Sequence, residues 1–90
     1  MIKNNPTVKE TFDLAYQNHQ KNNFEVAEIY YKKILKIDPE HFESTYLLGT
    51  LLFQMNKFKK AKKMLEKSIQ LNPNKVDAYN NLGITLQKLG

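Results

Sequence analysis

The feature that most constrains this chain is a pattern that recurs with a fixed period of about 34 residues. Asn22–Ala27 matches Asn56–Ala61, and Lys36–Pro39 matches Gln70–Pro73, each pair one period apart. The same spacing separates three leucines that each precede a small residue: Leu14-Ala15, Leu48-Gly49 and Leu82-Gly83. A period of this size is typical of stacked structural units, each packing against its neighbours.

The repeated segments have helical periodicity. Phe42, Thr45, Leu48, Leu52 and Met55 recur at spacings of three and four and therefore share one helical face. Only three Gly and three Pro occur in the 90 residues, which favours helix. The sequence therefore predicts an all-α fold of five helices, at about residues 7–21, 24–37, 40–55, 58–71 and 74–89.

The expected helix ends carry capping signals. Thr7 and Glu10 have the spacing of a capping box, and Asn23 is a good N-cap for the second helix. The pairs Asp38-Pro39 and Asn72-Pro73 place a capping residue before a proline at the first helical position. We therefore expect the third and fifth helices to begin at these prolines.

Small residues occupy the middle of three predicted helices. Gly49 and Gly83 stand where glycine costs about 1 kcal/mol relative to alanine, and Ala15 is at the equivalent place in the first helix. This cost is understandable if another helix approaches closely at each position. Asn18 stands where the later repeats have leucine, so either unit one is less well packed or Asn18 has a polar partner.

This pattern resembles the tetratricopeptide repeat (TPR), a helix–turn–helix unit with the same period. The resemblance covers residues 8–90, and Ala78–Gly83 is close to the family's consensus for a first helix. It implies TPR-type antiparallel helix pairs stacked in a right-handed superhelix. We expect a leader at 1–7, unit one at 8–41, unit two at 42–75, and the first helix of a truncated third unit at 76–90.

The resemblance also implies a function, because TPR domains hold a peptide or protein segment in a concave groove lined by the first helix of each unit. The family's principal groove positions fall in this sequence on Lys9, Phe12, Tyr16, His19, Tyr46, Thr50, Phe53, Asn80, Ile84 and Gln87. Beside them the same carry-over places Gln20, Glu43, Gln54, Asp77 and Lys88. Four of the principal residues are aromatic and are candidate anchors for a partner chain. The alternative is that some of them fold inward and complete the core.

One TPR subclass binds the acidic C-terminus of chaperones through a clamp of Lys, Asn and Arg side chains. Other residues stand at the clamp positions of this chain: Phe12, Tyr16, Leu47, Asp77 and Asn81. We therefore expect no binding to that class of tail.

The net charge of +5 is concentrated in one segment. Residues 57–67 contain six Lys and one Glu. Lys59, Lys60 and Lys63 share one face of the fourth helix, which the resemblance places on the convex side. They form a possible face for an anionic partner, although an ordinary solvated surface is the reading we favour. Nucleic acid is the less favoured partner, because the sequence has no Arg and the one aromatic residue in this run, Phe58, is assigned by the repeat to packing.

The sequence contains few residues of the types that commonly carry catalysis. The chain has no Cys, which excludes disulfides, thiolate metal sites and a Cys nucleophile. Its two histidines, His19 and His41, occupy different repeat positions and lack the spacing of a metal-binding pair. We therefore expect a non-catalytic scaffold with no cofactor, no metal and no small-molecule substrate. The alternative is the N-terminal TPR segment of a larger enzyme, such as a glycosyltransferase, that uses its repeats to select protein substrates.

The fifth helix carries an apolar stripe, and the sequence stops at Gly90 in the middle of a repeat. The chain is therefore expected either to be a piece of a longer array or to self-associate through Leu82, Leu86 and Leu89. The N-terminus has no signal-peptide pattern and no apolar run approaches about 20 residues, so a cytoplasmic location without membrane contact is the default expectation.

Overall fold

The computed structural model describes residues 7–90, in which every regular element is a helix. The helices are α1 (Val8–Gln20), α2 (Phe24–Ile37), α3 (Phe42–Gln54), α4 (Phe58–Leu71) and α5 (Val76–Leu89). All five lie at the expected places in the sequence, and the all-α TPR-type fold is confirmed. The expected leader lies, except for Thr7, outside the described residues.

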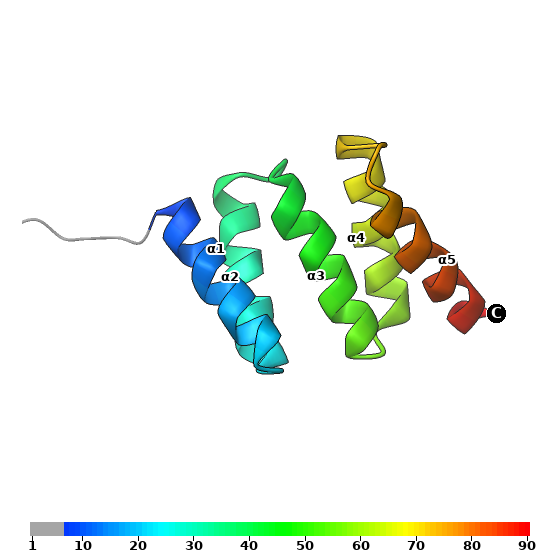
Figure 1. The fold of residues 1–90 in the computed structure, drawn as a ribbon, viewed down its shortest axis with the longest axis horizontal. Helices are drawn as coiled ribbons and strands as arrows, with labels where there is room; N and C mark the ends of the chain where they lie inside the picture. Colours follow the sequence, from blue (N-terminus) through cyan, green and yellow to red (C-terminus); the bar gives the residue numbers. More distant parts are fainter. Residues whose placement is uncertain (1–6) are drawn as a thin grey trace, which may run out of the picture.

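The helices form an antiparallel series in which each packs against the next. Figure 1 shows α1 and α3 in front of α2 and α4, with α5 at the other end of the row from α1. The pairs α1–α2 and α3–α4 are packed most extensively, and α2–α3 and α4–α5 join one pair to the next. No helix among residues 7–90 is long and apolar enough to cross a membrane.

The repeat period determines which residues are buried. Ala27 and Ala61, one period apart, are both fully buried, as are Tyr31 and Leu65 at the next equivalent pair of positions. The core cluster continues through Ala15, Leu48, Leu51 and Leu52. Alternation of small and large residues at these positions allows the helix pairs to interdigitate.

Gly49 confirms one of the expected close approaches. A Cβ at Gly49 would lie 2.9 Å from Cγ of Leu65 and 3.2 Å from its backbone nitrogen, so α4 crosses α3 directly over this residue. Gly83 has no such approach within residues 7–90: outside its chain neighbours and the backbone of its own helix, no heavy atom lies within 4 Å of a Cβ built there. That side of α5 has no neighbouring helix within the described part of the chain.

The capping box at α1 is confirmed. The backbone nitrogen of Thr7 donates to Oε1 of Glu10 over 2.9 Å, and the backbone nitrogen of Glu10 donates to Oγ1 of Thr7 over 3.0 Å. Asn23 occupies the N-cap position of α2, but its side chain makes no capping hydrogen bond there. Its Nδ2 instead donates to Oδ1 of Asn18, whose own Nδ2 donates to the carbonyl of Leu14, so Asn18 has the polar partners that it needs.

The expected helix starts at Pro39 and Pro73 were wrong. Helices α3 and α5 begin only after His41 and Lys75. Oδ1 of Asp38 accepts a hydrogen bond from the backbone nitrogen of Glu40, and Asn72 does the same for Asn74. Asp and Asn side chains favour such turns because they bond to the backbone two residues ahead, and here the turn takes the place of a helix cap.

Candidate functional site

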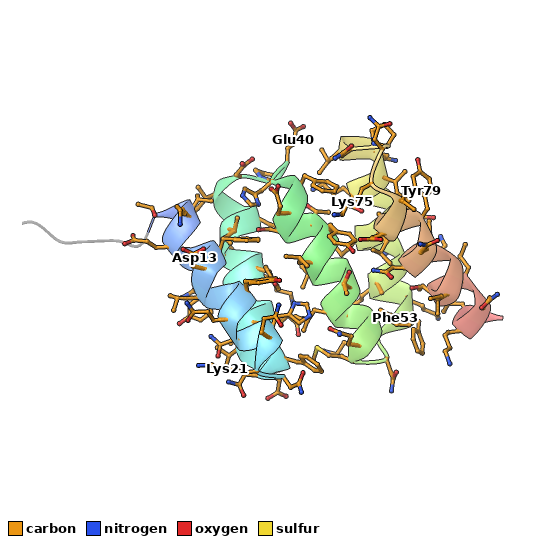
Figure 2. All side chains as sticks on the ribbon, viewed as in Figure 1. Asp13, Lys21, Glu40, Phe53, Lys75 and Tyr79 are labelled. Carbon is orange, nitrogen blue, oxygen red and sulfur yellow. The ribbon has the colours of Figure 1, made fainter. Side chains whose placement is uncertain are left out.

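The face formed by α1 and α3 has a hollow of about 270 Å³ toward the C-terminal ends of both helices. Tyr16, His19 and Gln20 line it from α1, and Leu47, Thr50 and Gln54 line it from α3, with Asn22 at one end. No Asp, Glu, Lys or Arg side chain lines this hollow. Figure 2 shows this face with Asp13 on α1 and Phe53 on α3 labelled.

His19 connects three helices below this hollow. Its Nδ1 lies 3.0 Å from the hydroxyl of Tyr31 on α2, and its Nε2 lies 2.6 Å from Oε1 of Gln54 on α3. Since Oε1 can only accept, Nε2 carries the proton and Nδ1 accepts the Tyr31 hydroxyl. Burial, together with the neighbouring Tyr16, raises the pKa of Tyr31, so its hydroxyl stays protonated and able to donate. The sequence placed His19 in the groove; the structure makes it part of the groove wall, with both nitrogens already bonded.

The four candidate aromatic anchors are not equivalent. Phe12 stacks on Tyr16 at 6.2 Å between ring centroids and also packs against the core, and Phe53 packs against the core and against Phe58 at 5.7 Å. Tyr16 is 43% exposed and lines the hollow. The Tyr46 ring is half-buried, with Nζ of Lys75 5.3 Å from its centroid. Phe12 and Phe53 therefore help to complete the core, and Tyr16 is the one exposed ring of the four.

A polar contact links α3 to α5 on the same face. Nδ2 of Asn81 donates to Oγ1 of Thr50 over 3.0 Å, and that hydroxyl donates to the carbonyl of Tyr46 over 3.1 Å. Thr50 is therefore both a wall of the hollow and the point at which α5 is attached to it. The bond places Asn81, which stands at one of the family's clamp positions, beside the hollow.

Several other expected groove residues lie outside the hollow. Lys9 is exposed at the start of α1 and pairs with Asp13 at 3.0 Å. Asn80, Ile84 and Gln87 are exposed along α5. They extend the candidate surface at its two ends, but the structure does not bring them together with Tyr16 and Thr50 in one cavity.

Two residues line the hollow without having been expected in the groove, Leu47 and Asn22. Leu47 was recognisable from its place at the family's clamp position. Asn22 lies in the turn after α1 with a positive φ of 64°. Asparagine adopts this conformation more readily than most residues, so the pair Asn22-Asn23 is the sequence signal for this turn.

The lysine-rich helix α4 forms a different surface. Nζ of Lys57 lies 3.7 Å from a carboxylate oxygen of Glu28, and Nζ of Lys62 lies 3.0 Å from one of Glu66. Lys59, Lys60 and Lys63 have no carboxylate within 4.0 Å among residues 7–90. They are exposed, on elements other than those that line the hollow between α1 and α3.

The two histidines have structural contacts. Nδ1 of His41 accepts a hydrogen bond from the backbone nitrogen of Ser44 and so caps α3, and its ring lies 5.7 Å from that of Phe12. Within residues 7–90 no group of three His, Cys, Asp or Glu side chains is placed to hold a metal ion. The arrangement around the hollow thus suits hydrogen bonding and packing.

Known proteins resemble the chain over most of its length. A family model described as anaphase-promoting complex, cyclosome, subunit 3 matches residues 20–90. The UDP-N-acetylglucosamine–peptide N-acetylglucosaminyltransferase of Caenorhabditis elegans is 30% identical over 77 residues, which are 86% of this chain and 7% of that enzyme. The chain therefore corresponds to a small part of this relative.

Two solved structures share the fold. The C-terminal TPR-containing domain of a Plasmodium falciparum FK506-binding protein superposes with a TM-score of 0.85 at 28% identity, covering 91% of this chain and 54% of that one. The first TPR of Spaghetti (RPAP3), solved with the HSP90 peptide SRMEEVD, gives a TM-score of 0.89 at 24% identity, covering 92% of this chain and 66% of that one.

Proposed function

Because the chain belongs to the tetratricopeptide repeat family, we propose that it is a non-catalytic scaffold that binds a segment of another protein on the face formed by α1, α3 and α5. The observation that carries the proposal is the hollow between α1 and α3, whose walls are held in place by the bonds of His19 and Thr50. A binding site with fixed walls loses little conformational entropy when a partner binds.

The chemistry of the lining indicates the kind of segment. Gln20, Asn22 and Thr50 offer amide and hydroxyl groups, which can bond to the backbone of an extended chain. Tyr16 and Leu47 supply apolar surface beside them. The proposed ligand is therefore an extended segment with few charges, held by its backbone and by one or two apolar side chains.

A solved relative supports a peptide as the class of ligand, since the Spaghetti TPR was determined with an HSP90 peptide. The acidic tail itself is a poor match for the groove of this chain. Phe12, Tyr16 and Leu47 stand where the clamp of that subclass needs polar and basic groups, so the proposal excludes the tail from this face.

The test is a capture experiment with the immobilised chain, read by mass spectrometry and followed by titration of the captured segment as a synthetic peptide. The groove variant is Tyr16→Ala/Gln20→Ala, which removes two exposed lining side chains. The matched control, Tyr79→Ala/Gln70→Ala, removes the same residue types from exposed positions outside the hollow. A peptide that binds wild type and control but loses affinity about tenfold for the groove variant supports the proposal. Equal binding by all three proteins would refute it.

The second candidate is that the chain is the substrate-selecting TPR segment of a larger enzyme. The observation that favours it is the 30% identity to a nematode glycosyltransferase, of which the matched part is 7%. Sequencing the gene beyond the codon for Gly90 tests it. Further repeats followed by a catalytic α/β domain would support this candidate, and a stop codon after one more helix would eliminate it.

Self-association through α5 is a further part of the proposal. Leu86 and Leu89 are 44% and 38% exposed, and Leu82 is half-buried beside them. An exposed apolar stripe of this kind favours pairing with a second copy. Sedimentation velocity across a hundredfold range of concentration tests it, and a monomer throughout would count against it.

A further inference from the structure

A second hollow, of about 200 Å³, lies between α2 and α4 on a different face of α3 from the groove. Its floor is apolar, made by Leu48 and Leu52 of α3 and Met64 of α4. Both leucines are almost fully buried, and Met64 is half-buried. In Figure 1 this region is on the side of α2 and α4, behind α3. The floor offers apolar surface to one inserted side chain.

The rim of this hollow is basic. Lys32 comes from α2, and Lys60 and Lys63 come from α4. Lysine stems cover apolar surface while their ammonium groups reach toward solvent, so the rim can present charge around an apolar centre. An anion that also carries an apolar group fits this arrangement, whereas a simple anion would leave the floor without a partner.

Glu28 is the one acidic residue that lines this hollow, and its negative charge is paired with lysines. One carboxylate oxygen of Glu28 lies 2.8 Å from Nζ of Lys32, and the other lies 3.7 Å from Nζ of Lys57. Burial alone would raise the pKa of Glu28, but the hydrogen bond from Lys32 and the positive charges of Lys32, Lys57 and Lys60 outweigh it and lower the pKa. Glu28 thus stays ionised and paired. Lys60 and Lys63 form no ion pair within residues 7–90 and can pair with an acidic partner.

A third hollow, of about 350 Å³, adjoins this one because Lys60 lines both. It is formed at the start of α4 by Lys57, Phe58, Lys59 and Lys60. The half-buried ring of Phe58 gives it an apolar wall. Two apolar recesses therefore flank Lys60, with Lys59 and Lys63 beside them.

We propose that the lysine-rimmed surface formed by the second and third hollows binds an acidic protein segment. The carboxylates of this segment pair with Lys60 and Lys63, and one of its apolar side chains enters the hollow above Leu48, Leu52 and Met64. Charge complementarity identifies the occupant as acidic, and the apolar floor identifies it as a protein segment. A nucleic acid would gain little here, because the chain has no Arg for bidentate phosphate contacts. The one aromatic ring that lines either hollow, that of Phe58, is half-buried and packs against Phe53.

The test is a fluorescence-anisotropy titration with two labelled peptides, EEDELLEDEE and EEDESSEDEE, which carry the same charge. The leucine peptide is expected to bind about tenfold more tightly than the serine peptide, and its affinity is expected to fall as salt is raised. Equal binding of the two peptides would refute a role for the apolar floor and reduce the surface to a general polyanion site.

The protein variants separate this surface from the rest of the chain. Lys60→Glu/Lys63→Glu is expected to weaken the leucine peptide at least tenfold, while Lys33→Glu/Lys36→Glu, with the same charge change on exposed residues of α2, changes it less than twofold. A second variant, Lys60→Met/Lys63→Met, removes the charges without adding acids and keeps the test available if circular dichroism shows that the double reversal is unfolded. It is expected to weaken binding by a smaller factor than the charge reversal. The groove variant Tyr16→Ala/Gln20→Ala is expected to bind as wild type does.

Three outcomes overturn the proposal. The first is undiminished binding by folded Lys60→Glu/Lys63→Glu and Lys60→Met/Lys63→Met. The second is loss of binding in the groove variant, which would assign the peptide to the face of α1 and α3. The third is tighter binding of a single-stranded oligonucleotide of ten phosphates than of the leucine peptide, which would make the surface a nucleic-acid site.

Discussion

Two glycines at equivalent places in the repeat are expected to respond in opposite ways to the same substitution. Gly49 and Gly83 are one repeat period apart, and both lie in the middle of a helix. Replacing either by alanine gains about 1 kcal/mol of helix propensity. At Gly83 the new methyl group meets no heavy atom of residues 7–90 within 4 Å apart from its chain neighbours and the backbone of its own helix, so that gain is the whole effect.

At Gly49 a steric clash with Leu65 outweighs the gain in helix propensity. The new methyl group would lie 2.9 Å from Cγ and 3.0 Å from Cδ2 of Leu65 and 3.2 Å from its backbone nitrogen. A different rotamer of Leu65 could move the side-chain atoms but not the nitrogen, so α4 itself must shift. Overpacking of this kind costs about 1 to 3 kcal/mol, which leaves Gly49→Ala destabilised by about 1 kcal/mol.

The assay is urea unfolding of the 90-residue chain followed by circular dichroism, with thermal unfolding alongside it. The two variants should differ by about 2 kcal/mol, and their melting temperatures should shift in opposite directions by roughly 4 to 8 °C each. A double-mutant cycle of Gly49→Ala with Leu65→Ala should show a favourable coupling, because the shorter side chain removes the contacts with Cγ and Cδ2, although not the one with the backbone nitrogen. Stabilisation by Gly49→Ala would refute the reasoning, since it would mean that α4 yields at no cost. Destabilisation by Gly83→Ala would mean that something covers α5, and concentration-dependent unfolding would identify it as a second copy.

Three further predictions concern the ends of helices and the buried acid. Thr7→Ala removes the capping box of α1 and should cost about 1 kcal/mol in urea unfolding, whereas Lys9→Ala on the same turn should cost less than half of that. Asn56 has a φ of 62°, so Asn56→Val should lower the free energy of unfolding by about 1 to 2 kcal/mol while Asn56→Gly leaves it near the wild-type value, and equal effects of the two would show that the turn can rearrange. The pKa of Glu28 is lowered in the fold, so its charge stabilises the fold above the ordinary value of 4.5 and this stabilisation is lost as the pH falls through the lowered pKa. Glu28→Gln should therefore be less stable than wild type by up to about 1 kcal/mol at pH 7 and equal to it near pH 2, and a difference that does not change with pH would contradict the ion pairs.

The sequence predicted those parts of the structure that depend on local spacing. The repeat period located the five helices, because the same helical pattern recurs from one unit to the next. The Phe24, Ala27 and Tyr31 positions of α2, for example, recur on the core-facing side of α4. The capping box of Thr7 involves residues three apart and was predicted for the same reason. The approach of α4 to Gly49 was also foreseen, because a costly glycine in a helix needs a reason in its packing.

The features that were missed depend on competition or on contacts distant in the sequence. Asp38 can cap a helix or close a turn, and only the structure shows that the turn prevails. The rotation of α1 decides whether Phe12 faces solvent or core, and spacing does not fix that rotation closely enough. The bridge from His19 to Gln54 joins residues 35 apart in the sequence, so no local pattern indicates it.

The second helices of the two repeats differ at two exposed positions, and this difference supports a function for the lysines. Position by position, Ala27 and Ala61 are both fully buried. The exposed positions of α2 carry Val26 and Ile29, and at the equivalent positions of the next unit α4 carries Lys60 and Lys63. The repeat fold does not require lysine there, since the first unit builds the same helix with apolar residues. Lys60 and Lys63 therefore are not needed to build the repeat, and their place on the rim of the hollow supports the proposed binding of an acidic partner.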